Sequence, residues 1–222
     1  MPYTRLLPEV AISELTPRKR RFFLKHLARF LLLFESVKAK GSFLDNKRVI
    51  VTAAPHQSGK DEYLMILMIL ALDIDVCYLS AKWTMRRIPI PFIKPKDIDN
   101  QGIPWPLGWL QEIVFRKFGA IPVDRKGNSG QYDSVVQELL KRDNFLLIIT
   151  PEGRFDATRF RSSFLYLAKE LEAEVMPVQI DYEHDTLKFL ESLNLDGSEE
   201  EVIQRLRSCF DGIKGRKSRF KA

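Results

Sequence analysis

Residues 47–72 read KRVIVTAAPHQSGKDEYLMILMILAL. The β-branched run at residues 47–52 predicts a buried strand, and the apolar run at residues 62–72 predicts a buried helix. The segment between them is a strand-to-helix turn that carries His56. In α/β proteins, such turns at the carboxyl ends of strands present reactive side chains, because the sheet fixes the backbone while the turn remains accessible. This stretch therefore predicts an α/β fold with a candidate functional site at the turn.

His56 and Asp61 are five residues apart across this turn. A neutral imidazole can take a proton from an alcohol when a carboxylate holds its second nitrogen, and the carboxylate then offsets the charge of the imidazolium. The pair therefore predicts a general base, His56, that is positioned by Asp61. A purely structural interpretation stands beside it, because residues 58–61, Ser-Gly-Lys-Asp, have the pattern of a helix capping box.

The composition favours one globular domain with an anionic partner. The chain has 222 residues, of which 45% are hydrophobic, and a net charge of +6. This charge suits membrane lipid, a phosphorylated substrate or nucleic acid. No recognition helix and no sheet pattern of interleaved aromatic and basic residues is found, so no nucleic-acid partner is expected. Cys77 and Cys209 have no metal or redox spacing, which predicts a reducing compartment.

Residues 16–37 predict a basic amphipathic helix that begins at Thr16 and Pro17. One face carries aromatic and leucine side chains and another carries cations: Phe23, Leu27, Phe30 and Phe34 against Arg18, Arg21, Lys25 and Arg29. Such a helix can lie in a membrane interface beside anionic headgroups, or it can pack its apolar face on the sheet of its own chain. The sequence leaves both possibilities open.

No signal peptide and no membrane-spanning run is predicted. The first twenty residues have no apolar core, and Asp73 ends the apolar run that starts at Tyr63. We therefore expect a cytoplasmic protein that is peripheral on the inner face of the membrane, with a membrane surface and anionic lipid among its partners.

Three stretches that come later in the sequence also carry distinctive motifs. Residues 119–125 read GAIPVDR after a predicted helix at 107–117, and a predicted strand at 145–150 runs into PEGR at 151–154. A further apolar strand is predicted at 175–180. Together with the turn, and in this order, these stretches resemble the four sequence blocks of the glycerolipid acyltransferases, the lysophosphatidate acyltransferase superfamily.

The resemblance extends from residue 49 to about residue 182. The first block, H-x-x-x-x-D, is matched by His56 and Asp61, and the second, G-x-I-x-V-D-R, by residues 119–125. The third, P-E-G-T-R, is matched by residues 151–153 without the usual threonine. The family implies an α/β fold, with a mixed, mostly parallel β-sheet flanked by helices.

The resemblance also implies an activity and a set of substrate-binding residues. The fatty acyl group would pass from an acyl thioester, acyl-CoA or acyl-carrier protein, to a hydroxyl of a phosphorylated glycerol or lysophospholipid, with His56 as the general base. No cofactor and no metal is implied. The implied substrate-binding residues are Lys82, Arg125, Glu152, Gly153 and Arg154. Since Arg154 comes one residue early in the third block, Arg159 and Arg161 stay open as alternatives to it.

We expect three parts in the chain: an N-terminal segment with the amphipathic helix (1–40), an acyltransferase domain (41–213) and a basic tail (214–222). Two other functions remain to be weighed. Residues 54–61, APHQSGKD, resemble the Walker A loop of a P-loop nucleotide kinase, but Ala54 replaces the first glycine and Asp61 the final Ser/Thr. The non-enzymatic alternative is a catalytically silent protein that binds membranes or lipids.

Overall fold

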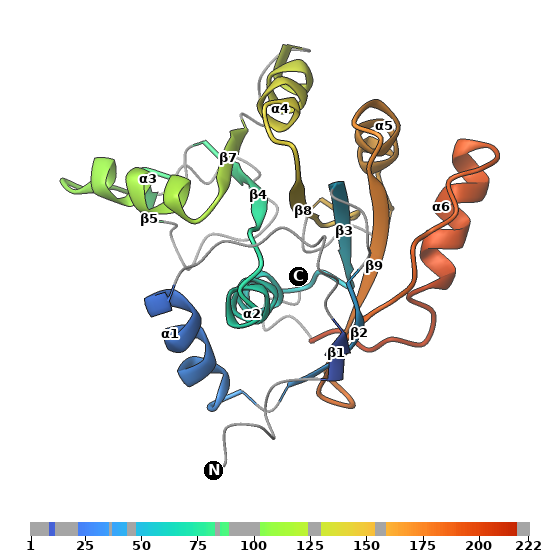
Figure 1. Ribbon diagram of the computed structural model, residues 1–222, viewed down its shortest axis with the longest axis horizontal. Coiled ribbons are helices and arrows are strands. Elements are labelled where there is room, and N and C mark those ends of the chain that lie inside the picture. Colours follow the sequence, from blue (N-terminus) through green and yellow to red (C-terminus); the bar gives the residue numbers. More distant parts are fainter. Residues whose placement is uncertain are drawn as a thin grey trace.

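The structure is a computed structural model with an α/β fold built on one mixed sheet (Figure 1). It describes residues 9–11, 22–35, 37–43, 48–82, 85–88, 103–123, 130–153 and 159–216. The main sheet contains β1 (Glu9–Ala11), β2 (Lys38–Ser42), β3 (Arg48–Ala54), β4 (Cys77–Ala81), β7 (Ala120–Val123), β8 (Phe145–Ile149), β9 (Glu174–Asp181) and β10 (Thr186–Phe189). Their order is β1-β2-β10-β9-β3-β8-β4-β7. All pairings are parallel except β9 with β10, which confirms the predicted mixed, mostly parallel sheet.

The strand β3 lies between β8 and β9 and is parallel to both. Its residues from Val49 to Ala54 are all buried, as expected for a β-branched strand that is covered on both faces. Thr52 lies opposite Ile149 of β8 and Pro177 of β9. The carboxyl ends of these three strands therefore meet at one edge of the sheet.

Six helices are described: α1 (Phe22–Leu32), α2 (Gly59–Ala71), α3 (Gly108–Lys117), α4 (Gly130–Leu140), α5 (Ser163–Glu170) and α6 (Glu199–Ser208). All of them except α3 contribute buried residues to one of two hydrophobic clusters on opposite sides of the sheet. Val49 and Val51 of β3 belong to the cluster with α1 and α2, whereas Ile50 belongs to the cluster with α4, α5 and α6. Because side chains alternate between the two faces of β3, this one strand packs against the helices on both sides of the sheet. A separate two-stranded ribbon, β5 (Arg87–Ile88) and β6 (Ile103–Pro104), lies next to α3 (Figure 1).

The C-terminal boundary of α1 differs from the predicted one. Instead of continuing to residue 37, α1 ends at Leu32, because the N–H groups of Leu33 and Phe34 turn to the carbonyls three residues back. The helix α5 begins at Ser163, and just before it the Arg161 N–H donates to the Pro151 carbonyl (2.8 Å), which holds that segment to the loop after β8. The predicted cap at Thr16 and Pro17 lies outside the described residues.

The helix α1 packs on α2 and is held there partly by its cations. Ala28 and Leu32 are buried in the cluster that contains α2. Lys25 Nζ lies 3.2 Å from Asp73 Oδ2, and Arg29 Nε donates to the Ala71 carbonyl (3.1 Å). These two basic residues therefore attach the helix to its own chain. None of the described helices is both long enough and apolar enough to cross a bilayer.

Candidate active site

His56, Asp61 and Glu152 lie together at the edge where β3 and β8 end. Their exposed fractions are 5%, 1% and 6%, and with Thr52 they are the buried polar or charged residues of the described chain. His56 is on the turn after β3, Asp61 is in the first turn of α2, and Glu152 follows β8. Buried titratable groups that meet at the carboxyl ends of strands are typical of a functional site, because folding alone rarely favours their burial.

The carboxylate of Asp61 both caps α2 and faces His56. Its Oδ2 accepts the N–H groups of Gln57 (2.7 Å) and Ser58 (2.8 Å) and lies 3.5 Å from His56 Nδ1. Its Oδ1 accepts the hydroxyl of Tyr182 at 2.6 Å. The capping-box pattern and the predicted histidine–aspartate pair are therefore formed by the same side chain.

These contacts keep Asp61 ionised. Burial on its own would raise the pKa of Asp61, but hydrogen bonds from His56, Tyr182, Ser58 and Gln57 outweigh it and hold this pKa below its ordinary value. An anionic Asp61 next to Nδ1 stabilises a positive charge on the imidazole. The arrangement has the electrostatics that a histidine base requires.

Glu152 is linked directly to the turn that carries His56. Its Oε1 accepts the backbone N–H of His56 at 3.1 Å, which ties the loop after β8 to the turn after β3. Its other oxygen, Oε2, is buried and has no hydrogen-bond partner among the described residues. Burial, helped by the charge of Asp61, raises the pKa of Glu152. Glu152 thus has a buried oxygen whose hydrogen-bonding capacity the described residues do not use.

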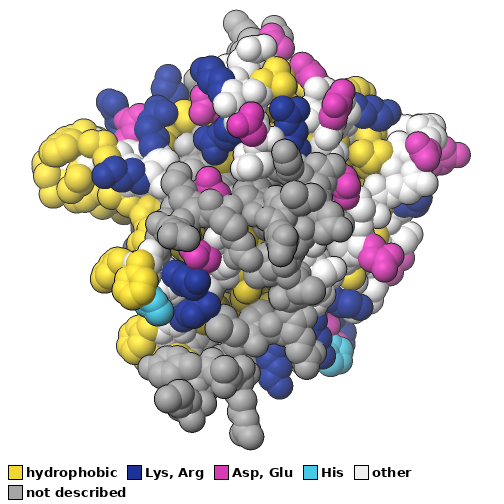
Figure 2. Space-filling view, in the orientation of Figure 1, with side chains coloured by type: hydrophobic (Ala, Val, Ile, Leu, Met, Phe, Trp, Pro, Cys, Tyr) yellow, Lys and Arg dark blue, Asp and Glu magenta, His cyan; other side chains and the backbone are white. Residues whose placement is uncertain are grey.

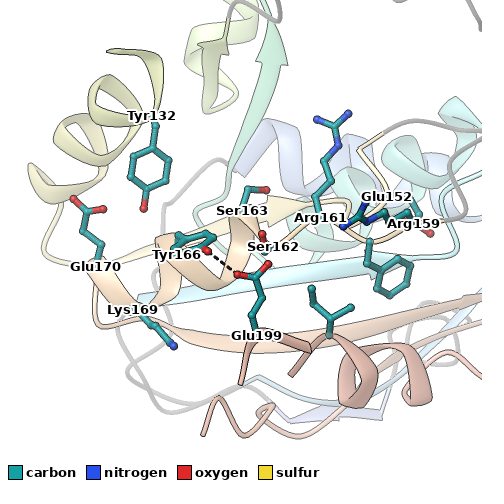
Figure 3. Close-up of a pocket in the computed structure, with 12 residues that line it drawn as sticks. Tyr132, Glu152, Arg159, Arg161, Ser162, Ser163, Tyr166, Lys169, Glu170 and Glu199 are labelled. Atoms are coloured by element: carbon teal, nitrogen blue, oxygen red, sulfur yellow. Dashed lines mark hydrogen bonds between the residues drawn. The ribbon is translucent and has the colours of Figure 1, made fainter. Parts of the chain in front are cut away.

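A cavity of about 1150 Å³ begins at Glu152 and extends along α5 (Figure 3). Arg159 and Arg161 line it at the same end as Glu152, whereas Tyr132 and Glu170 lie at the other end (Figure 3). Gly153 has φ +69°, and a Cβ there would lie 3.1 Å from Arg161 Nε. The arginine side chain therefore packs directly over the glycine, beside Glu152.

The structure brings four predicted site residues together and separates a fifth from them. His56, Asp61, Glu152 and Gly153 meet at one edge of the sheet. Lys82 follows β4, two strands from β3; it is exposed, and its N–H donates to the Val123 carbonyl (2.7 Å). The remaining two, Arg125 and Arg154, lie outside the described residues. Of the alternatives to Arg154, both Arg159 and Arg161 line the cavity.

The same turn does not favour the P-loop interpretation. Lys60 Nζ lies 2.6 Å from Glu35 Oε2, so the lysine head is directed to an acidic residue that follows α1. The N–H groups of Gln57 and Ser58, which a phosphate would need, donate to Asp61. These donors bind acidic side chains of the protein itself.

The described residues give little support to catalysis by a cysteine nucleophile or by a bound metal ion. Cys77 is fully buried, and burial raises its pKa to about 12, so its thiol stays protonated and is not a nucleophile. In this part of the chain, no group of three or more His, Cys, Asp or Glu side chains is placed to hold a metal ion.

Sequence reasoning missed the role of Tyr182. This residue directly follows β9, and its hydroxyl reaches Asp61 across 121 positions in the sequence. The available signal was its place at the end of a strand that pairs with β3, next to the fourth sequence block. A polar aromatic residue at that edge can reach the turn because β3 and β9 are neighbours.

Comparison with protein families found a match to part of the chain. The family model described as Acyltransferase matches residues 106–181, which include α3, β7, α4, β8, Glu152 and β9. His56 and Asp61 precede this segment, and the sheet places them beside it. No curated protein matched the chain. The matched segment supports membership of the glycerolipid acyltransferase superfamily and, with it, general acyl transfer.

Proposed function

We propose that the protein is an O-acyltransferase of phospholipid biosynthesis. It moves a fatty acyl group from an acyl thioester, acyl-CoA or acyl-carrier protein, to a hydroxyl of a phosphorylated glycerol or lysophospholipid. The observation that carries the proposal is the buried contact between His56 Nδ1 and Asp61 Oδ2, beside Glu152. The family match supports the more general part of this proposal, acyl transfer. The proposed reaction needs no cofactor and no metal.

The proposed reaction is a direct transfer. With Nδ1 directed to Asp61, His56 takes the hydroxyl proton of the acceptor on Nε2. The acceptor oxygen forms a bond to the thioester carbonyl carbon, whose oxygen becomes an oxyanion stabilised by nearby hydrogen-bond donors. When the oxyanion collapses, the C–S bond breaks and the leaving sulfur takes the proton from His56. The products are an ester and a free thiol, and no covalent acyl-enzyme is formed.

The cavity beside Glu152 is the proposed acceptor site. Arg161 and Arg159 line the same end of it, and a guanidinium group can hold a phosphate through paired, charge-assisted hydrogen bonds. The buried Oε2 of Glu152 would bind an acceptor hydroxyl. Lys82, Arg125, Gly153 and Arg154 remain proposed contributors by their places in the family blocks.

The test is acceptor-dependent release of free thiol. Purified protein is incubated with a long-chain acyl-CoA, or with acyl-carrier protein as donor, and with glycerol-3-phosphate or lysophosphatidate. We expect thiol release only when an acceptor is present, with one acylated acceptor formed per thiol by mass spectrometry. Absence of release with every donor and acceptor, with vesicle binding retained, would favour the catalytically silent lipid-binding alternative.

We further propose that the protein acts on the cytoplasmic surface of a membrane with anionic lipids. Apolar side chains on α1, α3 and the β5–β6 ribbon are exposed on one side of the molecule, and Figure 2 shows hydrophobic groups there with Lys and Arg beside them. We call these residues the apolar edge: Phe22, Phe23, Leu27, Phe30, Leu33, Phe34, Ile88, Ile103, Leu107, Trp109, Leu110, Ile113 and Val114. A soluble monomer rarely exposes such a large apolar surface, whereas a lipid interface can accept it.

Replacing Phe23 and Trp109 together with serine is expected to weaken vesicle binding at least about tenfold, because each large apolar side chain contributes roughly 1.5–3 kcal/mol when buried. Their exposed fractions are 73% and 57%. Sedimentation with vesicles of mixed anionic and neutral lipids measures the binding. Leu140→Ser, on α4, is the control, because Leu140 is also exposed (42%) but belongs to the other helical layer. Equal loss in both variants would argue against the apolar edge.

A further inference from the structure

Tyr182 connects the catalytic turn to the C-terminal part of the chain. Its side chain is half-buried, and its hydroxyl donates to Asp61 Oδ1 at 2.6 Å. Its backbone N–H donates to the carbonyl of Lys214 at 3.0 Å. The tyrosine is thus fixed at both its backbone and its hydroxyl.

The C-terminal segment, residues 213–216, also lies against the turn, at Gly215. A Cβ on Gly215 would lie 2.7 Å from Pro55 Cγ and 2.8 Å from the side chain of Gln57, so only glycine fits against these two side chains as they stand. Lys214 Nζ lies 2.7 Å from Glu183 Oε1, next to Tyr182. The C-terminal segment therefore packs between the turn and the residues that follow β9.

We propose that Tyr182 is a positioning residue, whose hydroxyl fixes the Asp61 carboxylate with Oδ2 toward His56, and that residues 213–216 hold Tyr182 in place. This inference rests on the proposed function of His56 as a base.

The hydrogen bonds of the carboxylate explain why the tyrosine matters. Two backbone N–H groups fix Oδ2, whereas Oδ1 accepts the short bond from Tyr182 and a longer contact from the Ser58 hydroxyl (3.2 Å). Without the Tyr182 hydroxyl, Oδ1 keeps only the serine contact, so the carboxylate is less restrained. A hydrogen bond to a charged group is also among the stronger ones in proteins.

Tyr182 stays a donor over the whole range of an assay. Burial and the hydrogen bond to Asp61 raise the pKa of Tyr182 well above its ordinary value. The charged or titratable groups that face this pair are His56 on the turn, Glu152 after β8 and Arg216 in the C-terminal segment. Removing the hydroxyl concentrates the Asp61 charge toward His56, which favours the imidazolium and keeps the base protonated to higher pH.

Tyr182→Phe tests the proposal, with Tyr63→Phe as the matched control. Tyr63 is an exposed residue of α2, two positions from Asp61. We expect Tyr182→Phe to lower kcat about tenfold with KM for donor and acceptor unchanged, because one hydrogen bond to a charged group is lost. The acidic limb of the kcat profile should move to higher pH. Tyr63→Phe should change neither quantity, and an unchanged kcat and pH profile in Tyr182→Phe would overturn the inference.

A second measurement separates this inference from the proposed function. NMR titration follows the imidazole of His56 in wild type and in Tyr182→Phe, with His26 and His184 as internal references. We expect the midpoint of the His56 titration to move to higher pH while the references stay in place. If the His56 midpoint shifts but the protein shows no acyl transfer, the proposed function is rejected and the positioning role of Tyr182 is retained. No shift, or a shift of all three histidines together with a lower melting temperature, would reject the positioning role.

Discussion

Replacing His56 with alanine is expected to lower kcat for acyl transfer by about a hundredfold or more, the contribution typical of a positioned general base. His56 is buried, its Nδ1 faces an ionised Asp61, and its N–H holds Glu152. The backbone contact to Glu152 survives in alanine, so KM for the acceptor should change much less than kcat. Initial rates of thiol release at saturating donor and acceptor measure the effect.

The control for this variant is His184→Ala. His184 also lies close to an aspartate, with Nδ1 2.7 Å from Asp181 Oδ2, but it is exposed and has no contact with the turn that carries His56 among the described interactions. Its loss should leave kcat within about twofold of wild type, since exposed ion pairs contribute little. If both variants retained full activity, His56 would not be the base.

Replacing Gly119 with alanine is expected to destabilise the fold by about 2–4 kcal/mol, because both backbone strain and a steric clash oppose it. Gly119 has φ +92°, and a Cβ there would lie 2.0 Å from the Val76 carbonyl oxygen. The residue joins α3 to β7, and its own carbonyl accepts the N–H of Tyr78 in β4 (3.1 Å). Thermal unfolding should show the melting temperature lowered by roughly 5–15 °C.

Gly212→Ala isolates the strain from the clash. Gly212 also has a positive φ (+76°), but no described residue has an atom within 4 Å of the position that its Cβ would take. We expect it to cost only about 1 kcal/mol, the lower end of the cost of a left-handed residue. Equal losses for the two variants would show that the contact with Val76 is unimportant. A large loss at Gly119 alone would give the first residue of the second sequence block a structural role.

The central elements of the fold could be predicted because burial requires their residues to be mostly apolar. The runs that became β3, α2, β8 and β9 each contain a long apolar stretch, and their order along the chain gives parallel strands with crossover helices. The edge strands have no such signal. In β2, which reads KAKGS, Ala39 is the buried residue, and the strand forms through its pairing with β10. In β10 the alternation of Leu187 and Phe189 is present, but it spans only four residues.

The site could be predicted only as far as its residues lie on regular elements. Once β3 and β8 are adjacent and parallel, the turn with His56 and the loop with Glu152 must meet. Arg161 reaches the site through a loop whose path depends on specific contacts, such as the hydrogen bond from its N–H to the Pro151 carbonyl, and the bond from the Tyr182 hydroxyl to Asp61 is a single side-chain contact at the end of β9. No periodicity in the sequence encodes such contacts.

The strand β3 lies between two strands that come much later in the sequence, and this affects folding during synthesis. His56 and Glu152 are 96 residues apart, and β9 is later still. At a synthesis rate of about 5–20 residues per second, roughly 5–20 seconds pass between the emergence of β3 and that of β8 from the ribosome. During this time β3 lacks both of its neighbouring strands, so the apolar α2 has no completed sheet to cover and the nascent chain exposes one of its most hydrophobic segments. We therefore expect the growing chain to depend on chaperones until β8 and β9 enclose β3.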